Sequence, residues 1–127
     1  MFTEVIPPQP SYAEVRRWPR YVINVPVRVV AKKPDKTVIA TGRSIELNEG
    51  GMGVFAGVEL QTGERVEVEF TPPYGMPLRV RATVRNRNGY KYGVEFLLLS
   101  REDKMQAEQI SQVLQAIALT NETPASK

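Results

Sequence analysis

The chain of 127 residues contains neither cysteine nor histidine. These absences exclude disulfides, thiolate nucleophiles, Ser-His-Asp triads, and zinc or haem sites built on Cys or His ligands. The sequence also lacks a large excess of charge of one sign, because its 17 basic and 14 acidic residues leave a net charge of only +3. This balance suits an anionic ligand but falls short of a polybasic arm that binds nucleic acid. Any catalysis would have to use carboxylate, lysine, tyrosine or serine groups.

Long apolar runs are absent as well, and none approaches the ~20 residues that a membrane span requires. The first eight residues show no charged region followed by an apolar segment, so we expect no signal peptide and a cytoplasmic protein. Residues 1–14 hold three prolines and no lasting period, which predicts a flexible tail. We expect one domain over residues 15–120 and a disordered tail over residues 121–127.

Between the tails, apolar and polar residues alternate, as in half-buried β-strands. The alternation is interrupted by turn signals such as Asn48-Glu49-Gly50-Gly51 and Asn88-Gly89. The expected strands are residues 21–29, 37–45, 52–58, 65–70, 78–85 and 90–96. Six short strands joined by short turns predict a small antiparallel barrel or sandwich. A closed barrel is favoured because closure removes the exposed sheet edges.

The period changes after Ser100, which carries an acidic residue three positions later and therefore has the pattern of a helix N-cap. Ile110, Val113, Leu114 and Ile117 follow at helical spacing. We predict one amphipathic helix over residues 101–119. Its apolar stripe is expected to cover an end of the barrel, and the alternative is a partner-binding helix. The expected state is a monomer or a weak homodimer.

Three sets of residues could carry binding chemistry. The first is Arg16-Arg17-Trp18-Pro19-Arg20, in which three guanidinium groups precede the first strand. Arginine matches phosphate with two parallel hydrogen bonds and stacks on purine faces. The alternative is a solvated basic linker.

The second set begins with Glu46 and Asn48, whose side chains alternate on one strand face and precede glycines at 50, 51 and 53. Glycine permits a close backbone approach, and a carboxylate with an amide could contact a base edge. The alternative is an ordinary strand that ends in a glycine-rich bulge.

The third set is the row of arginines at 79, 81, 85 and 87, which could extend an anion-binding surface. The alternative is a solvated barrel wall on which Glu67 and Glu69 of the neighbouring strand balance the charge.

The first two sets, in this order, resemble the PilZ domain, the bacterial receptor module for cyclic di-GMP. Arg16 and Arg20 match the two arginines of that family's Arg-x-x-x-Arg motif. Glu46, Asn48 and Gly51 fall on the three positions of its Asp/Asn-x-Ser-x-x-Gly motif. The segments 51–54 and 92–96 also resemble the family, so the similarity extends from residue 16 to about residue 100. The resemblance implies a mainly β fold, a six-stranded antiparallel barrel with one C-terminal helix, in agreement with the periodicity.

The resemblance also implies a ligand-binding role for Arg16, Arg17, Arg20, Glu46, Asn48 and Gly51. The arginines would pair with phosphate and with the O6/N7 edge of guanine. Glu46 would accept hydrogen bonds from guanine N1–H and N2–H₂, and the backbone near Gly51 would approach the ligand closely. Binding would order residues 10–20 and present a new surface to a protein effector. On this view the protein is not an enzyme and uses neither a metal nor a cofactor.

Two alternatives remain open. Glu46 stands where the family usually has Asp or Asn, and Asn48 stands where it has Ser, which favours a PilZ-like scaffold that acts only through protein contacts. The other alternative is a small barrel that binds single-stranded nucleic acid, which requires exposed aromatic side chains among basic residues. We rank it last because the tyrosines fall mainly on the inward phase of the strands.

Overall fold

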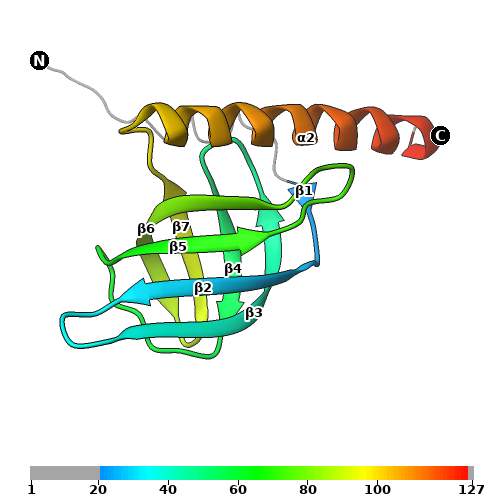
Figure 1. The fold of residues 1–127 in the computed structure, drawn as a ribbon. Coiled ribbons are helices and arrows are strands. Elements are labelled where there is room, and N and C mark those ends of the chain that lie inside the picture. The colour runs from blue at the N-terminus through cyan, green and yellow to red at the C-terminus, as the bar shows by residue number, and fades with distance from the viewer. Residues whose placement is uncertain (1–20, 126–127) are drawn as a thin grey trace, which may run out of the picture.

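Seven strands and one long helix make up residues 21–125, which are the part of the chain that the computed structural model describes (Figure 1). The alternating segments form strands because β-branched side chains on one face pack into a common core. The strands are β1 (Tyr21–Val22), β2 (Pro26–Lys32), β3 (Thr37–Leu47), β4 (Gly51–Ala56), β5 (Arg65–Phe70), β6 (Leu78–Asn88) and β7 (Lys91–Phe96). The helix is α2 (Arg101–Ala125).

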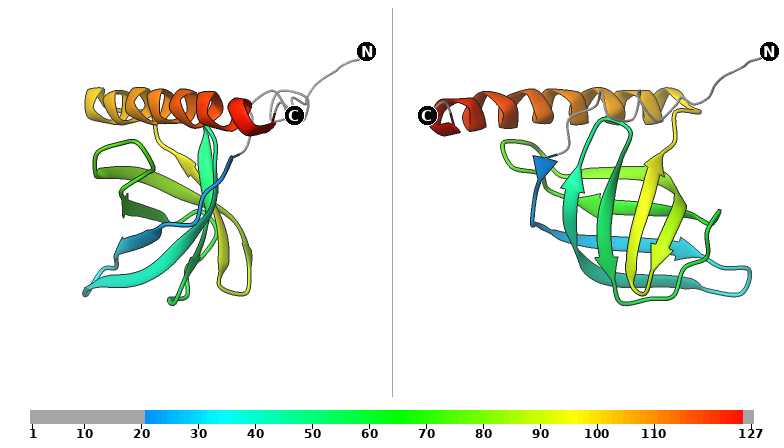
Figure 2. Two further views of the ribbon diagram at one scale, coloured as in Figure 1. Left: turned by 90° about the vertical axis from the view of Figure 1, so that its right-hand side faces the viewer. Right: turned by 180° about the vertical axis from the view of Figure 1, so that it is seen from behind.

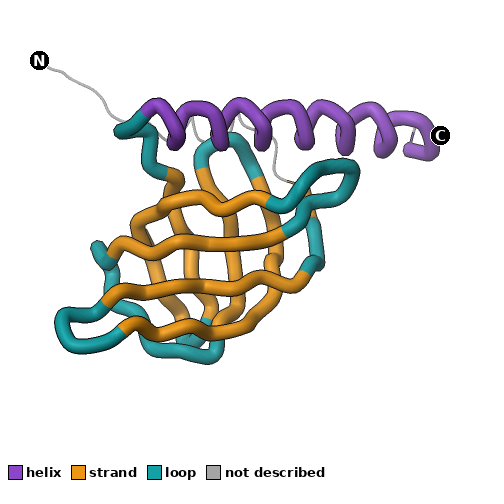
Figure 3. Tube along the Cα trace, in the orientation of Figure 1, coloured by secondary structure: helices purple, strands orange, loops and turns teal. Residues whose placement is uncertain are grey.

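Six of the strands close into an antiparallel barrel, which confirms the predicted fold class. Their order is β3-β2-β5-β6-β7-β4, and β4 pairs again with β3. The closure occurs on β3, where Gly42 pairs with Val27 of β2 and with Ala56 of β4. The tube in Figure 3 shows the strands of the two walls crossing around the core. The inward phase of each strand is buried, as Val29, Val68 and Val84 show.

The first expected strand, residues 21–29, is broken. β1 pairs with the end of β3 and β2 pairs with its beginning, and residues 23–25 connect the two. The buried hydroxyl of Ser44 bridges this break: it accepts a hydrogen bond from the N–H of Val25 and donates one to the carbonyl of Ile23, both at 2.9 Å. Pro26, which has no N–H to donate, comes directly after the break.

The helix α2 lies across one end of the barrel (Figures 1 and 2). Ile110, Val113, Leu114 and Ile117 are buried and close the core at that end. The helix is longer than the predicted 101–119 and continues into the segment expected to be a disordered tail, as far as Ala125. The apolar period ends at Ile117, but no glycine or proline follows until Pro124, so little opposes propagation of the helix.

The start of α2 is fixed by one carboxylate, that of Asp103. Its Oδ2 accepts hydrogen bonds from the N–H groups of Leu99 and Ser100, and the Ser100 hydroxyl accepts one from the N–H of Asp103. This is the predicted capping box, with aspartate in place of glutamate. The guanidinium of Arg81 on β6 donates to both oxygens of the same carboxylate, at 3.0 and 2.7 Å. A single side chain thus joins the helix to the barrel wall.

We expect Asp103→Asn to lower the free energy of unfolding by about 1–3 kcal/mol, because charge-assisted hydrogen bonds are lost at a buried position. Hydrogen bonds from Arg81 hold the pKa of Asp103 well below its ordinary range; burial opposes this shift, and the N–H groups of Ser100 and Leu99 add to it. Because the folded-state pKa is depressed, the stabilisation is complete above the unfolded-state pKa of about 3.9 and is lost as the pH falls below it. Urea unfolding from pH 7 to pH 2 tests this. The difference in unfolding free energy between wild type and variant should become smaller below pH 4. A difference that stays constant with pH would contradict this prediction.

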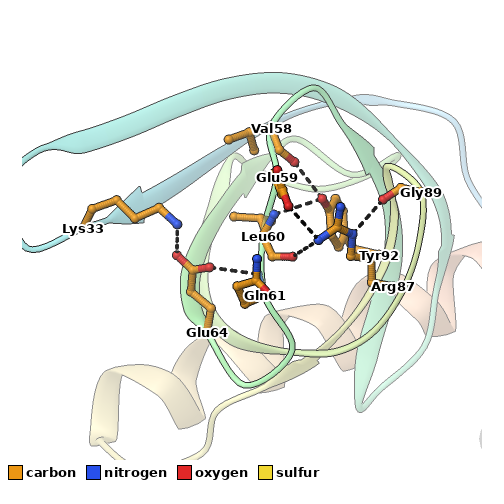
Figure 4. Close-up of polar contacts among 9 residues, drawn as sticks. All are labelled: Lys33, Val58, Glu59, Leu60, Gln61, Glu64, Arg87, Gly89 and Tyr92. Carbon is orange, nitrogen blue, oxygen red and sulfur yellow. Dashed lines mark hydrogen bonds and ion pairs between the residues drawn. The ribbon is translucent and has the colours of Figure 1, made fainter.

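The barrel end opposite α2 is closed by the loop between β4 and β5 (Figures 1 and 4). Leu60 is fully buried there, and its N–H donates to the hydroxyl of Tyr92, which itself donates to the carbonyl of Val58. Arg87 lies over the Tyr92 ring and donates to the carbonyl of Leu60. The Tyr92 side chain and the Arg87 guanidinium therefore both hold the loop between β4 and β5 in place.

Candidate functional site

An open depression of about 700 Å³ lies on the outer face of β3, β4, β7 and β6. These strands stand side by side in the right-hand view of Figure 2. Among the side chains around the depression are those of Glu46, Asn48, Arg85 and Asn86. The structure thus brings together Glu46, Asn48 and Gly51 of the second predicted set. Arg16, Arg17 and Arg20, like the expected tail 1–14, lie outside the described residues.

Glu46 is aimed outward by an irregularity in the strand pairing. The register of β3 with β4 shifts between Ser44 and Glu46, so that Ile45 is an extra residue and Glu46 lies opposite Gly53. A bulge of this kind redirects the side chain that follows it. Glu46 is half-buried and lines the depression.

Asn48 shapes the turn between β3 and β4. Its Oδ1 accepts a hydrogen bond from the N–H of Gly50 at 2.7 Å, and its backbone N–H donates to the carbonyl of Gly51 at 3.0 Å. Asparagine commonly closes a turn in this way. Because the oxygen is committed to the turn, the side-chain amide can offer a ligand its NH₂ group as a donor.

Gly51 has a structural reason to be glycine. A Cβ atom at this position would lie 2.1 Å from the carbonyl oxygen of Val94 on β7, far inside contact distance. The missing side chain therefore lets β4 and β7 pair at the rim of the depression. The expected closeness of this backbone to a ligand remains a prediction.

The four arginines of the third set do not form one surface. Arg79 pairs with Glu69 and Arg81 with Asp103, on the wall away from the depression. Arg85 lines the depression and forms an ion pair with Glu95 of β7. Arg87 also borders it, although its guanidinium is engaged with Leu60 and Gly89. Arg85 is therefore the member of the row that an anion at the depression could reach, in competition with Glu95.

A second open depression, of about 760 Å³, lies on the wall formed by β2, β5 and β6. Its main charges neutralise one another, because Glu69 pairs with both Arg28 and Arg79. The described residues around it include none of the second predicted set, and those of the first set lie outside the described part of the chain. We therefore regard the depression at Glu46 as the candidate site.

The expectation that the tyrosines lie mainly on the inward phase of the strands was partly wrong. Of the tyrosines in the described part of the chain, only Tyr92 is buried, whereas Tyr74 and Tyr90 are 67% and 58% exposed. These two lie in different loops, Tyr74 between β5 and β6 next to α2 and Tyr90 in the turn between β6 and β7. They do not make a row of stacking platforms on one face.

Asn86 is one of the residues lining the depression that the sequence did not predict. A second irregularity, between Val84 and Asn86 on β6, places it opposite Gly93 of β7. The sequence gives no local sign of this bulge, although a glycine within a strand, as at Gly53 and Gly93, is a known mark of close approach.

Within residues 21–125, no group of acidic side chains is arranged to hold a metal ion, and no helix is long and apolar enough to cross a bilayer.

The family model for the PilZ domain matches residues 14–112. Among solved structures, the PilZ domain of YcgR from Escherichia coli with c-di-GMP is 19% identical, with a TM-score of 0.64 over 88% of this chain and 98% of that one. The PilZ domain of CeSA from a cellulose-synthesizing bacterium is 18% identical, with a TM-score of 0.61 over 78% and 97%. The Bacillus subtilis inhibitor of motility MotI/DgrA is 17% identical, with a TM-score of 0.56 over 81% and 51%. No curated protein matches the chain.

The structural likenesses support the barrel and its C-terminal helix as a shared fold. The family match extends from before the arginines to within α2 and so covers most of the chain. It confirms the resemblance seen in the two motifs: the chain belongs to the PilZ domain family.

Proposed function

We propose that this PilZ domain binds cyclic di-GMP in the depression on β3, β4, β7 and β6. Arg16, Arg17 and Arg20 would bind from one side, and Glu46, Asn48 and the backbone near Gly51 from the other. The observation that carries the proposal is the register of β1. Tyr21 pairs with Leu47 and Val22 with Glu46. Since consecutive Cα atoms are about 3.8 Å apart, this pairing brings the chain that follows Arg20 to the edge of the depression.

The chemistry of the ligand fits this arrangement. Cyclic di-GMP carries two phosphates and two guanines, and arginine can pair with either the phosphate or the O6/N7 edge of guanine. The carboxylate of Glu46 can accept from guanine N1–H and N2–H₂, and the Nδ2 group of Asn48 can donate. The solved YcgR domain with the same fold contains this ligand, which supports the choice of nucleotide.

The role that follows is that of a receptor rather than an enzyme. Binding would order residues 10–20 against the barrel, and the changed surface would contact a protein effector in the bacterial cytoplasm. The domain needs no metal or catalytic group for this role. Hydrogen exchange with and without cyclic di-GMP tests the relay, and equal protection of residues 10–20 in both states would contradict it.

Isothermal titration of the full chain with cyclic di-GMP tests the proposed function. We expect saturable binding, and we expect no comparable binding of a single-stranded oligonucleotide. If neither ligand binds, the protein would instead be a scaffold that acts only through protein contacts. The departures from the family motif at Glu46 and Asn48 are the argument for that alternative. Binding of the oligonucleotide alone would favour the nucleic-acid alternative.

A further inference from the structure

The helix α2 carries a second stripe of residues on a different face from its buried one. The buried stripe ends at Ile117, whereas the helix continues to Ala125 (Figure 1). The second stripe recurs at alternating steps of four and three residues, which is the spacing of a seam between two packed helices. Its members, which we call the outer stripe, are Met105, Gln109, Gln112, Ala116 and Leu119. The first three of them are exposed.

The loop between β5 and β6 widens this face. Its residues Tyr74 and Met76 are exposed and line a recess of about 210 Å³ against α2, together with Gln109 and Gln112 of the outer stripe. Among the described residues that line the recess, none is charged. The buried centres of protein interfaces are likewise enriched in tyrosine and methionine and depleted in charge. The loop and the outer stripe thus form one uncharged, partly apolar surface.

The backbone shows that the exposed ring of Tyr74 is held in a fixed place. Its φ is 63°, in the left-handed region that bulky residues rarely adopt. The next residue packs tightly, because a Cβ atom on Gly75 would lie 2.8 Å from the Cγ2 of Val113 on α2 and 2.9 Å from the Cγ of Pro72. The loop is therefore fixed against the helix while it presents an aromatic ring to solvent in an unfavourable conformation. Strained residues of this kind cluster at functional surfaces.

We infer that a second copy of this chain covers the surface, with the two α2 helices antiparallel and Gln112 on the two-fold axis. In that arrangement the outer stripe meets itself, because Met105 lies opposite the second copy of Leu119 and Gln112 lies opposite its own copy. An amide side chain both donates and accepts hydrogen bonds, so glutamine can pair with glutamine across a two-fold axis, as no charged side chain can. The net charge of +3 opposes association through charged faces, whereas the outer stripe contains no charged residue.

This association leaves the candidate site open. Ser111 is two residues from Gln109 and so lies on the other side of the helix, where its hydroxyl donates to Oε2 of Glu49 at 3.3 Å. Glu49 belongs to the turn that Asn48 closes at the candidate depression. The depression and the outer stripe therefore lie on opposite flanks of α2. Self-association and ligand binding are separate properties, and the inference does not depend on cyclic di-GMP.

An exchange of charge at Gln112 tests the inference by sedimentation velocity. We expect the full-length wild type to shift from monomer to dimer as its concentration rises. Gln112→Glu and Gln112→Lys each place like charges against each other on the axis and should stay monomeric, whereas an equal mixture of the two should restore the dimer. Position 112 is exposed, and glutamate and lysine suit a helix as well as glutamine does, so the melting temperature should hardly change. Gln61→Lys is the control for added charge, because it lies in the loop at the opposite end of the barrel and should associate like the wild type.

Tyr74→Asn tests the loop. Asparagine adopts a positive φ more readily than tyrosine, so the variant monomer should be at least as stable as the wild-type monomer. Its dimer should dissociate about tenfold more readily, because an aromatic contact is lost. A wild type that stays monomeric at its highest soluble concentration would overturn the inference. So would a dimer that persists in both Gln112 variants, or two monomeric variants whose mixture does not associate. Wild-type association of Tyr74→Asn would contradict the part assigned to the loop.

Discussion

Gly42→Ala is expected to destabilise the barrel severely, by about 3 kcal/mol or more. A Cβ atom at this position would lie 1.8 Å from the carbonyl oxygen of Phe55 and 3.0 Å from the Cα of Ala56. Both are backbone atoms of β4, so neither can rotate away as a side chain could. Only a displacement of the strand would relieve the overlap.

The position of Gly42 makes such a displacement costly. It is the point at which β3 pairs with β2 on one side and with β4 on the other, and so the point where the barrel closes. Small domains have a total stability of about 5–15 kcal/mol, so the loss would be a large part of it. Urea and thermal unfolding measure the effect, with Gly57→Ala as the glycine replacement that meets no neighbour. A Gly42→Ala protein as stable as that control would contradict our account of closure.

The predictable part of the fold is the part encoded by local alternation. Residues 65–70 were expected to form a half-buried strand, and Val66, Val68 and Phe70 are buried on one face of β5. The helix start was predictable for the same reason, since Ser100 and Asp103 are only three residues apart and exchange the capping hydrogen bonds with each other's backbone. Local patterns suffice where the partners are neighbours in sequence.

The break in the first strand was not predictable from that pattern. Ile23, Val27 and Val29 are all buried, so the phase continues across residues 23–25 and nothing in the alternation marks an interruption. The break depends on the hydroxyl of Ser44, which lies on a different strand. A serine in a strand has no sequence signature that separates this role from an exposed one.

The candidate site was likewise predictable from the sequence only in part. Glu46 and Asn48 were predicted because they lie with Gly51 in one short motif. Asn86 and Gly93 belong to the site through the pairing of β7 with β4, two strands that are distant in sequence. That pairing joins strands that local alternation does not connect, and the alternation gives no sign of the bulge before Asn86. The arginine row likewise appeared continuous, but Arg81 serves the helix cap while Arg85 borders the depression.

Arg16→Ala and Arg20→Ala are each expected to weaken cyclic di-GMP binding by about ten- to a hundredfold, since each removes a charge-assisted contact worth about 1.5–3 kcal/mol. Both residues precede β1 in the sequence and fall outside the alternating apolar phase of the strands. We therefore expect the melting temperature to stay close to that of the wild type. Titration of each variant, with thermal unfolding of the same samples, measures both quantities.

A loss of affinity could also arise from the lower net charge alone, and Arg28→Ala controls for this. Arg28 lies on β2, pairs with Glu69 and borders the other depression, so its removal changes the charge equally without touching the candidate site. Arg20→Lys keeps the charge but lacks the planar fork that pairs with phosphate or guanine through two hydrogen bonds. Under our assignment Arg28→Ala binds like the wild type, whereas Arg20→Lys is weakened nearly as much as Arg20→Ala. An equal loss of affinity in Arg28→Ala would mean that the arginines act only through general electrostatic attraction. Wild-type affinity in Arg16→Ala or Arg20→Ala would show that the replaced arginine does not contact the ligand.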